Sequence, residues 1–241
     1  MSHRRRQQAP ATNQPARYRP ALSAAQQRTL RKWHDDSHQR ILATLPLQQS
    51  VLGLEFVVGQ DVYPPGNEDF YQFVRAHVNP NDRVLDMGTG SGAVALVAAQ
   101  GSAHVIAVDI NPSAIACAHA NAVRNRLQSL ITFRHSDVFA AVPESFDLIA
   151  FNPPYRWFAP RSLLEMATAD EGYRALSAFM AQAKDHLLPH GRILMGFGSS
   201  GDIDYLHALI EGHGFHKEVT PAGTQKRNGM TVNYYHFRLT A

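Results

Sequence analysis

Apolar and polar residues alternate along this chain in two different periods. Short apolar runs such as RVLDMG and HVIAVDI have the length and composition of buried strands. Longer segments between them, such as FYQFVRAHV and PSAIACAHANAVRNRL, have the period of amphipathic helices. Because strands and helices follow one another in turn, the pattern predicts an α/β fold: a doubly wound sheet of seven mostly parallel strands with helices on both faces.

The N-terminal region departs from this alternation. Its first twenty residues contain Arg, Gln, Pro and Ala but almost no large apolar side chains, which predicts a disordered basic arm. A helical pattern then begins at Ser23, a good N-cap residue, and Pro46 ends it. Its apolar positions available for burial are Leu30, Trp33, Ile41, Leu42 and Leu45.

Two short segments, LGLEFVVG and DVY, follow this helix and have the composition of strands. We therefore predict three parts in the chain: a disordered arm over 1–20, a helical lid or extension over 21–58, and a single α/β domain over 59–241.

The basic charge of the chain is concentrated in its N-terminal region. Residues 1–40 contain nine Lys or Arg and two Asp, a balance of +7, whereas residues 41–241 have a balance of −4. A basic arm can bind nucleic acid, but the acidic remainder favours a solvated tail. The chain has no apolar run of membrane-spanning length and no secretory signal, and the single Cys117 fits a reducing compartment, so we expect a cytoplasmic protein.

A glycine-rich loop follows the first strand of the predicted domain, in the segment VLDMGTGSG. Glycines at a strand-to-helix turn let the backbone turn tightly and let a ligand approach closely. Asp86 lies just before the glycines, where a carboxylate can receive a ligand's ammonium group or a water molecule. The candidate ligand-binding residues of this loop are Asp86, Gly88, Thr89, Gly90 and Gly92.

Two further aspartates end the next two strands, and the carboxyl ends of parallel strands meet at one edge of a sheet. Asp109, followed by Ile110, is where an acidic residue binds ribose hydroxyls. Asp137 can accept from an adenine amino group, with the Val138 amide on a ring nitrogen. The loop lacks the GxGxxG spacing that binds a pyrophosphate. This order of sites therefore indicates S-adenosylmethionine (SAM) rather than a dinucleotide.

The segment IAFNPPYRWF ends the fourth strand in a stiff turn, since each proline restricts the residue before it. The Asn152 amide oxygen and the Pro153 carbonyl can both accept from one NH2 group, which aims its nitrogen at the methyl group of SAM. The Tyr155 ring offers a face for stacking. The candidate substrate-binding residues beside this turn are Pro154, Arg156, Trp157 and Phe158, although the two aromatic residues can equally pack under a loop.

From about residue 59 to 200 the chain resembles a class I SAM-dependent methyltransferase of the NPPY subgroup, with a Rossmann-like fold. It is similar to the glutamine N5-methyltransferases and to those that modify exocyclic amines of bases. The resemblance implies SAM as cofactor, S-adenosylhomocysteine as product, and a contact of Tyr63, in GQDVYPPGNEDF, with the methionine part of SAM. Asp69 stands where that family usually has Thr.

The acceptor is not fixed by these motifs. We predict an N-methyltransferase for a planar amide or amine, with a small-molecule acceptor slightly favoured over a protein glutamine and a nucleic acid base third. Other hypotheses are an enzyme that cyclises or cleaves SAM itself and a SAM-binding module without catalysis. We expect a monomer or homodimer, no membrane partner and no metal, because the pairs His34/His38 and His186/His190 have no third ligand.

Overall fold

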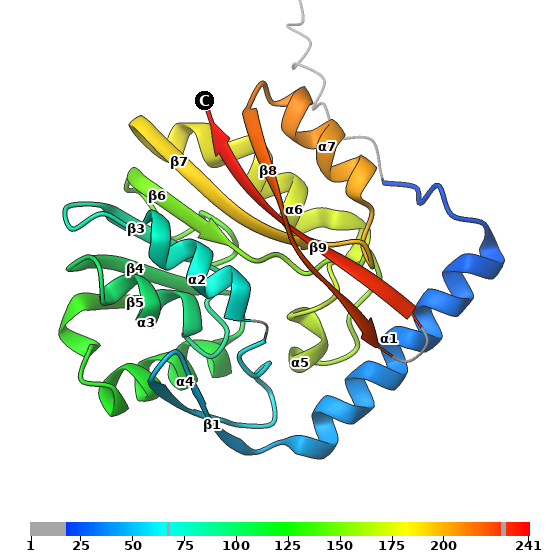
Figure 1. The fold of residues 1–241 in the computed structure, drawn as a ribbon, viewed down its shortest axis with the longest axis horizontal. Coiled ribbons are helices and arrows are strands. Elements are labelled where there is room, and N and C mark those ends of the chain that lie inside the picture. Colours follow the sequence, from blue (N-terminus) through cyan, green and yellow to red (C-terminus); the bar gives the residue numbers. More distant parts are fainter. Residues whose placement is uncertain (1–17, 67, 228–229) are drawn as a thin grey trace, which may run out of the picture.

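A computed structural model describes residues 18–66, 68–227 and 230–241. Its centre is a seven-stranded sheet in the order β5-β4-β3-β6-β7-β9-β8 (Figure 1). β3 to β7 are parallel, and β9 runs antiparallel to both of its neighbours. The predicted fold class is therefore confirmed. The strands are β3 (Arg83–Met87), β4 (His104–Asp109), β5 (Ile131–His135), β6 (Phe146–Phe151), β7 (Leu187–Gly198), β8 (His216–Arg227) and β9 (Met230–Thr240).

Helices cover both faces of the sheet, because successive strand residues point to opposite sides. In β3, Val84 belongs to one buried cluster, with α2, α3 and α4, whereas Leu85 belongs to the other, with α6 and α7. The helices of these two layers are α2 (Glu68–His77), α3 (Ala93–Ala99), α4 (Pro112–Arg124), α6 (Arg174–Gln182) and α7 (Ile203–Gly212). The shorter ones are α5 (Leu163–Met166), η1 (Gln128–Leu130), η2 (Glu171–Tyr173) and η3 (Ala183–His186).

A long helix, α1 (Ala24–Thr44), lies along one side of the molecule beside α5 (Figure 1). Ser23 caps it, as predicted, and forms a capping box with Gln26. Leu30 and Trp33 are buried as expected, but Leu42 is 37% exposed, because only one face of the helix is covered. Residues 1–17, which make up most of the predicted basic arm, lie outside the described residues.

A β-hairpin of β1 (Leu47–Val51) and β2 (Leu54–Val58) follows α1. The strand predicted over LGLEFVVG is confirmed as β2, but it begins only at Leu54, since Leu52 and Gly53 both have positive φ and form the two-residue turn. The prediction of a strand at DVY was wrong: Asp61–Tyr63 is a turn and loop, begun by a Val62 amide bond to the Gly59 carbonyl.

The topology reverses between β3 and β6, since the chain passes to β4 and β5 on one side of β3 and returns to β6 on the other. In open α/β sheets ligands bind at the carboxyl ends of the strands beside such a reversal. The loops after β3, β4, β5 and β6, which hold the predicted site residues, therefore share one edge. Among the described residues, no helix combines the length and apolar character needed to cross a membrane.

Candidate functional site

Two cavities meet at the carboxyl edge of the sheet. The large cavity, about 1300 Å³, follows the ends of β3 to β6. The small cavity, about 400 Å³, lies between the turn after β6, β9 and α1. Tyr63, Asn152 and Ala167 line both. The predicted site residues that line the large cavity are Tyr63, Gly88, Gly90, Asp109, Ile110, Asp137, Val138, Asn152, Pro154 and Trp157.

Asp109 is held in place by the backbone around it. Its two carboxylate oxygens accept from the Gly90 amide at 2.9 Å and the Asn111 amide at 2.8 Å. Burial raises the pKa of this carboxyl, while these amide bonds act against the rise. Each oxygen retains a second lone pair for a ligand. Two fixed acceptors at the end of β4 suit a pair of neighbouring hydroxyls.

The glycine loop divides into cavity-lining and packing positions. Gly90 has a φ of +54°, and a Cβ there would meet no atom within 4 Å, so its backbone is open to the large cavity. Gly92 does not line the cavity. A Cβ at Gly92 would lie 3.0 Å from the Ala118 Cβ, so its missing side chain lets α3 pack against α4.

Asp86 and Thr89 are likewise buried beneath the loop and do not line the large cavity. The Asp86 carboxylate accepts from the Ala95 amide at 3.0 Å, near the start of α3. Burial raises the pKa of Asp86 to about 7. In this position the carboxylate supports the turn into α3.

The loop after β5 forms one end of the large cavity, and an ion pair lies there. The Arg174 guanidinium donates to both carboxylate oxygens of Asp137, at 3.0 and 3.1 Å. Val138, the next residue, has a φ of 50°, which is unusual for a β-branched residue. The Ser136 hydroxyl donates to the Val138 carbonyl at 2.8 Å and stabilises this turn. Strained backbone of this kind is typical of ligand sites.

The turn after β6 joins the two cavities. The Tyr155 hydroxyl donates to Asn152 Oδ1 at 2.8 Å. The Tyr155 ring packs against Phe197, with centroids 5.1 Å apart. Asn152 is exposed to both cavities, whereas Pro153, Tyr155 and Arg156 line only the small one.

Trp157 and Phe158 do not share a pocket. Trp157 lines the large cavity and packs against Tyr18, with ring centroids 5.8 Å apart. Phe158 lines neither cavity; its ring packs against His34 at 5.6 Å and under the Arg31 guanidinium at 4.9 Å. The two rings contact each other, with centroids 5.4 Å apart, but only that of Trp157 reaches the large cavity.

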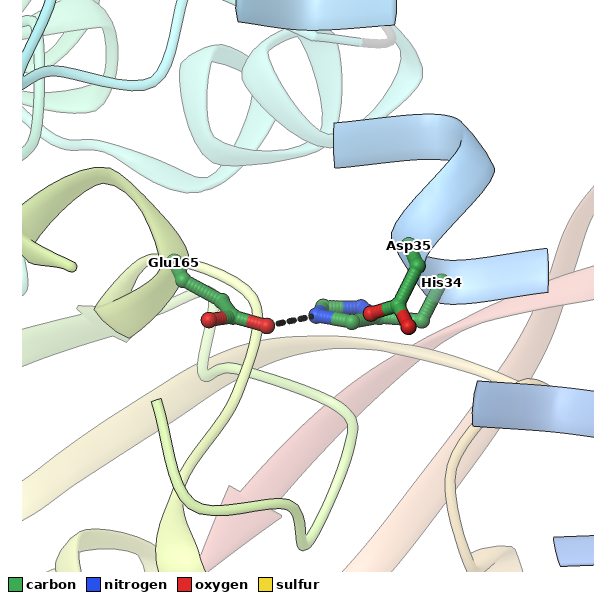
Figure 2. A group of neighbouring side chains, drawn as sticks. All are labelled: His34, Asp35 and Glu165. Atoms are coloured by element: carbon green, nitrogen blue, oxygen red, sulfur yellow. Dashed lines mark hydrogen bonds and ion pairs between the residues drawn. The ribbon is translucent and has the colours of Figure 1, made fainter. Parts of the chain in front are cut away.

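Ion pairs attach α1 to α5. Figure 2 shows Glu165 of α5 pointing toward His34 of α1, with Asp35 beside it; the His34 Nε2 and Glu165 Oε1 atoms are 2.8 Å apart. One ligating atom from each of these three residues lies within 4.8 Å of the others. However, Arg161 donates to Glu165 at 2.9 Å and to Asp35 at 2.6 Å. The guanidinium therefore occupies the carboxylates, and the cluster is an anchor for α1.

Sequence reasoning missed two residues of the site, Tyr173 and Arg174. The Tyr173 hydroxyl donates to the Tyr155 carbonyl and accepts from the Asp202 amide, both at 2.7 Å, so it holds the turn after β6 against the start of α7. Neither residue has a motif or spacing that marks it. Only the fold brings them to the site.

The residues of the large cavity fit SAM. The carboxylate of Asp109 suits a ribose diol, and Ile110, Val138 and Phe151 supply apolar surface for a flat base. The open backbone at Gly90 leaves room for close approach. The cavity reaches Asn152, which places the reactive part of such a ligand beside the small cavity.

Comparison with known proteins agrees with this geometry. The release factor glutamine methyltransferase of Cereibacter sphaeroides is 37% identical to this chain over 61% of the chain's length. The matched region spans 58% of that relative's length. The protein of the same name from Koribacter versatilis is 30% identical over 78% of this chain and 69% of its own. The ribosomal protein L11 methylase of Lactobacillus delbrueckii subsp. bulgaricus shares the fold, with a TM-score of 0.54, 20% identity and coverage of 80% of this chain and 89% of its own.

Family membership follows from a direct match. The sequence pattern of the methyltransferase small domain matches residues 65–219, more than half of the chain. The resemblance to class I SAM-dependent methyltransferases is therefore confirmed, and with it SAM as the methyl donor of the family. The chain belongs to the methyltransferase small domain family.

Proposed function

We propose that this protein is a SAM-dependent N-methyltransferase that methylates the side-chain amide of a glutamine in a protein. The observation that supports this most directly is the position of Asn152, exposed where the large and small cavities meet. One cavity has the residues to bind SAM, and the other is open to an acceptor. Bound SAM supplies an electrophilic methyl group.

The chain's own residues act by positioning the acceptor. The Asn152 side-chain oxygen and the Pro153 carbonyl accept from the NH2 group of the amide, which fixes the direction of its nitrogen. These oxygens also stabilise the positive charge that develops on the nitrogen as it gains a methyl group, before it loses a proton. The Tyr155 hydroxyl holds Asn152 Oδ1 in place.

The α1 helix acts as a lid over the acceptor. Trp33, His34 and Ile41 of α1 line the small cavity. The ion pairs Arg31–Glu165 and Arg161–Asp35, together with the His34–Glu165 hydrogen bond, hold the helix against the rest of the domain. A helix in this position excludes water from the reacting groups.

The names of the relatives favour a protein acceptor. Two of them are release factor glutamine methyltransferases, and a third from Methanocaldococcus jannaschii is named a putative protein N5-glutamine methyltransferase. They do not support the preference for a small-molecule acceptor that the sequence alone gave. We therefore propose a translation release factor as the acceptor protein.

The test is methyl transfer to fractionated acceptors. Purified protein is incubated with methyl-labelled SAM and with the protein, nucleic acid and small-molecule fractions of a cell extract, and with SAM alone. We expect label in the protein fraction, removed by protease, and one added methyl on a glutamine by peptide mass spectrometry. Label only in nucleic acid or small molecules, or SAM consumed without any acceptor, contradicts the proposal.

A further inference from the structure

A buried arginine lies beside the proposed acceptor site. Arg156 is only 8% exposed and lines the small cavity. Its Nη1 atom donates to the Thr168 carbonyl at 3.4 Å, its Nη2 atom donates to the Ser200 hydroxyl at 3.3 Å, and its Cζ atom lies 4.7 Å from the centre of the Trp33 ring. Its Nε atom is buried and has no hydrogen-bond partner.

This guanidinium has no counter-ion within the chain. All Asp and Glu residues lie in the part of the chain that the structure describes, and none of them forms an ion pair with Arg156. Glu165 forms ion pairs instead with Arg31 and Arg161, and a hydrogen bond with His34. A buried charge without a partner is costly unless a ligand supplies one.

The rest of the small cavity is also without negative charge. Among its described lining residues are Arg40 and Arg156 and three histidines, but no Asp or Glu. Burial and the charge of Arg156 lower the pKa of His34, to about 4, so the imidazole is neutral at pH 7. The cavity therefore has a positive potential, concentrated on a group that still has a free donor.

We propose that the small cavity binds a carboxylate of the acceptor through Arg156, next to the amide held by Asn152. This rests on the proposed function, since it describes the acceptor of the same site. The carboxylate can come from the main chain of a C-terminal glutamine or from an acidic side chain beside an internal glutamine of a protein. In both cases Arg156 determines specificity, because the guanidinium N–H groups that Thr168 and Ser200 leave free donate to a carboxylate oxygen.

The first test is binding to the unmodified chain with S-adenosylhomocysteine bound. Calorimetry compares N-acetylglutamine, which has both amide and carboxylate, with N-acetylglutaminamide, which lacks the carboxylate. A second pair, acetyl-Ala-Gln-Glu-amide and acetyl-Ala-Gln-Gln-amide, places the carboxylate on a neighbouring side chain. We expect the acidic member of one pair to bind at least about tenfold more tightly, the scale of a charge-assisted hydrogen bond.

Variants then assign the preference to one residue. In Arg156→Met the acidic and neutral probes bind equally, while Arg156→Lys retains part of the preference. The matched control, Arg238→Met, removes a partly exposed arginine of β9 that pairs with Glu218, and it keeps the full preference. If Arg156→Met does not fold, Arg156→Lys and the comparison of probes on the unmodified chain still test whether the cavity prefers a carboxylate.

The outcomes distinguish the two sources of the carboxylate, and they distinguish failure of this inference from failure of the proposed function. A preference only for N-acetylglutamine identifies the main-chain carboxylate of a C-terminal glutamine, and one only for the Glu peptide identifies an acidic neighbour of the glutamine. Equal binding within both pairs, or a preference that persists in Arg156→Met, overturns the inference. Because binding is measured without methyl transfer, failure of the proposed function appears separately, as absence of label on any protein.

Discussion

The Tyr155 hydroxyl donates a hydrogen bond of 2.8 Å to Asn152 Oδ1, the oxygen that we propose orients the acceptor amide. Asn152 itself is exposed, so little else fixes the rotation of its side chain. Tyr155 is fixed, because its ring packs on Phe197 and its carbonyl accepts from the Tyr173 hydroxyl. Because Tyr155 is held by the core, its hydrogen bond restricts the rotation of the exposed Asn152 amide.

Replacing this hydroxyl tests that relationship. Tyr155→Phe keeps the ring packing but frees Asn152, so kcat is expected to fall about tenfold, the scale of one hydrogen bond. SAM affinity stays unchanged, because Tyr155 does not line the large cavity. Steady-state kinetics and calorimetry measure the two quantities. An unchanged kcat shows that the hydroxyl does not position Asn152.

Asp109 is predicted to bind the ribose hydroxyls of SAM. Asp109→Ala removes two acceptors and also the bonds to the Gly90 and Asn111 amides, so SAM affinity is expected to fall about ten- to a hundredfold. Asp147→Ala is the control, since its carboxylate accepts from the Arg83 amide at the opposite ends of the strands. Calorimetric affinities that match between the two variants contradict the assignment.

The glycines of the loop are expected to respond differently. Gly92→Ala brings a Cβ within 3.0 Å of Ala118 at a φ of +91°, so it lowers the free energy of unfolding by about 1–3 kcal/mol. Gly90→Ala is also strained, by about 1–2 kcal/mol at a φ of +54°, but its methyl group meets no neighbouring atom and takes space in the large cavity. Urea unfolding and SAM titration of both variants check this. A larger loss of SAM affinity in Gly92→Ala reverses the interpretation.

The anchor of α1 predicts a dependence of stability on pH. Burial, with the charge of Arg156, lowers the pKa of His34 to about 4, whereas an unfolded histidine titrates near 6.5. Below pH 6.5 the unfolded chain therefore binds a proton that the folded chain does not, and stability falls by about 1.4 kcal/mol per pH unit toward pH 4 from this residue. The pKa of Glu165 is lowered to about 2, so this residue reduces the free energy of unfolding only below pH 4.5.

Urea unfolding at pH 6.5 and pH 5 isolates the histidine. His34→Gln retains a donor for Glu165 but does not titrate, so the loss of unfolding free energy between these pH values is expected to shrink by about 1–2 kcal/mol. His38→Gln, on the same helix and partly exposed, keeps the loss. An identical pH dependence in all three proteins contradicts the low pKa of His34.

Much of the fold was predictable because its signals are local. The apolar runs of β3, β4 and β6 and the glycines after β3 identify a parallel sheet and its functional edge. Asp109, Asp137 and Asn152 meet there because parallel strands end together. The wrong strand at DVY has a local cause as well: the Val62 amide donates to the Gly59 carbonyl and closes a turn, which the strand-like composition of these three residues did not show.

The contacts that complete the site were not predictable, because they join distant segments. His34 and Glu165 are 131 residues apart in sequence, and Arg174 reaches Asp137 across 37 residues. The directions of Trp157 and Phe158 depend on where Tyr18 and α1 pack, which no motif states. For the same reason the sequence identified Arg156 as a candidate but not as a buried cation without a counter-ion.

Asn152→Ala tests the central claim most directly. We expect the variant to fold normally, since Asn152 is exposed, and to keep its SAM affinity within about threefold, less than one hydrogen bond is worth. Its single-turnover rate of methyl transfer to the acceptor protein falls by about a hundredfold or more, as for loss of an oriented acceptor. A variant that binds SAM and transfers the methyl group at the normal rate contradicts the account, because the acceptor amide then does not lie at Asn152.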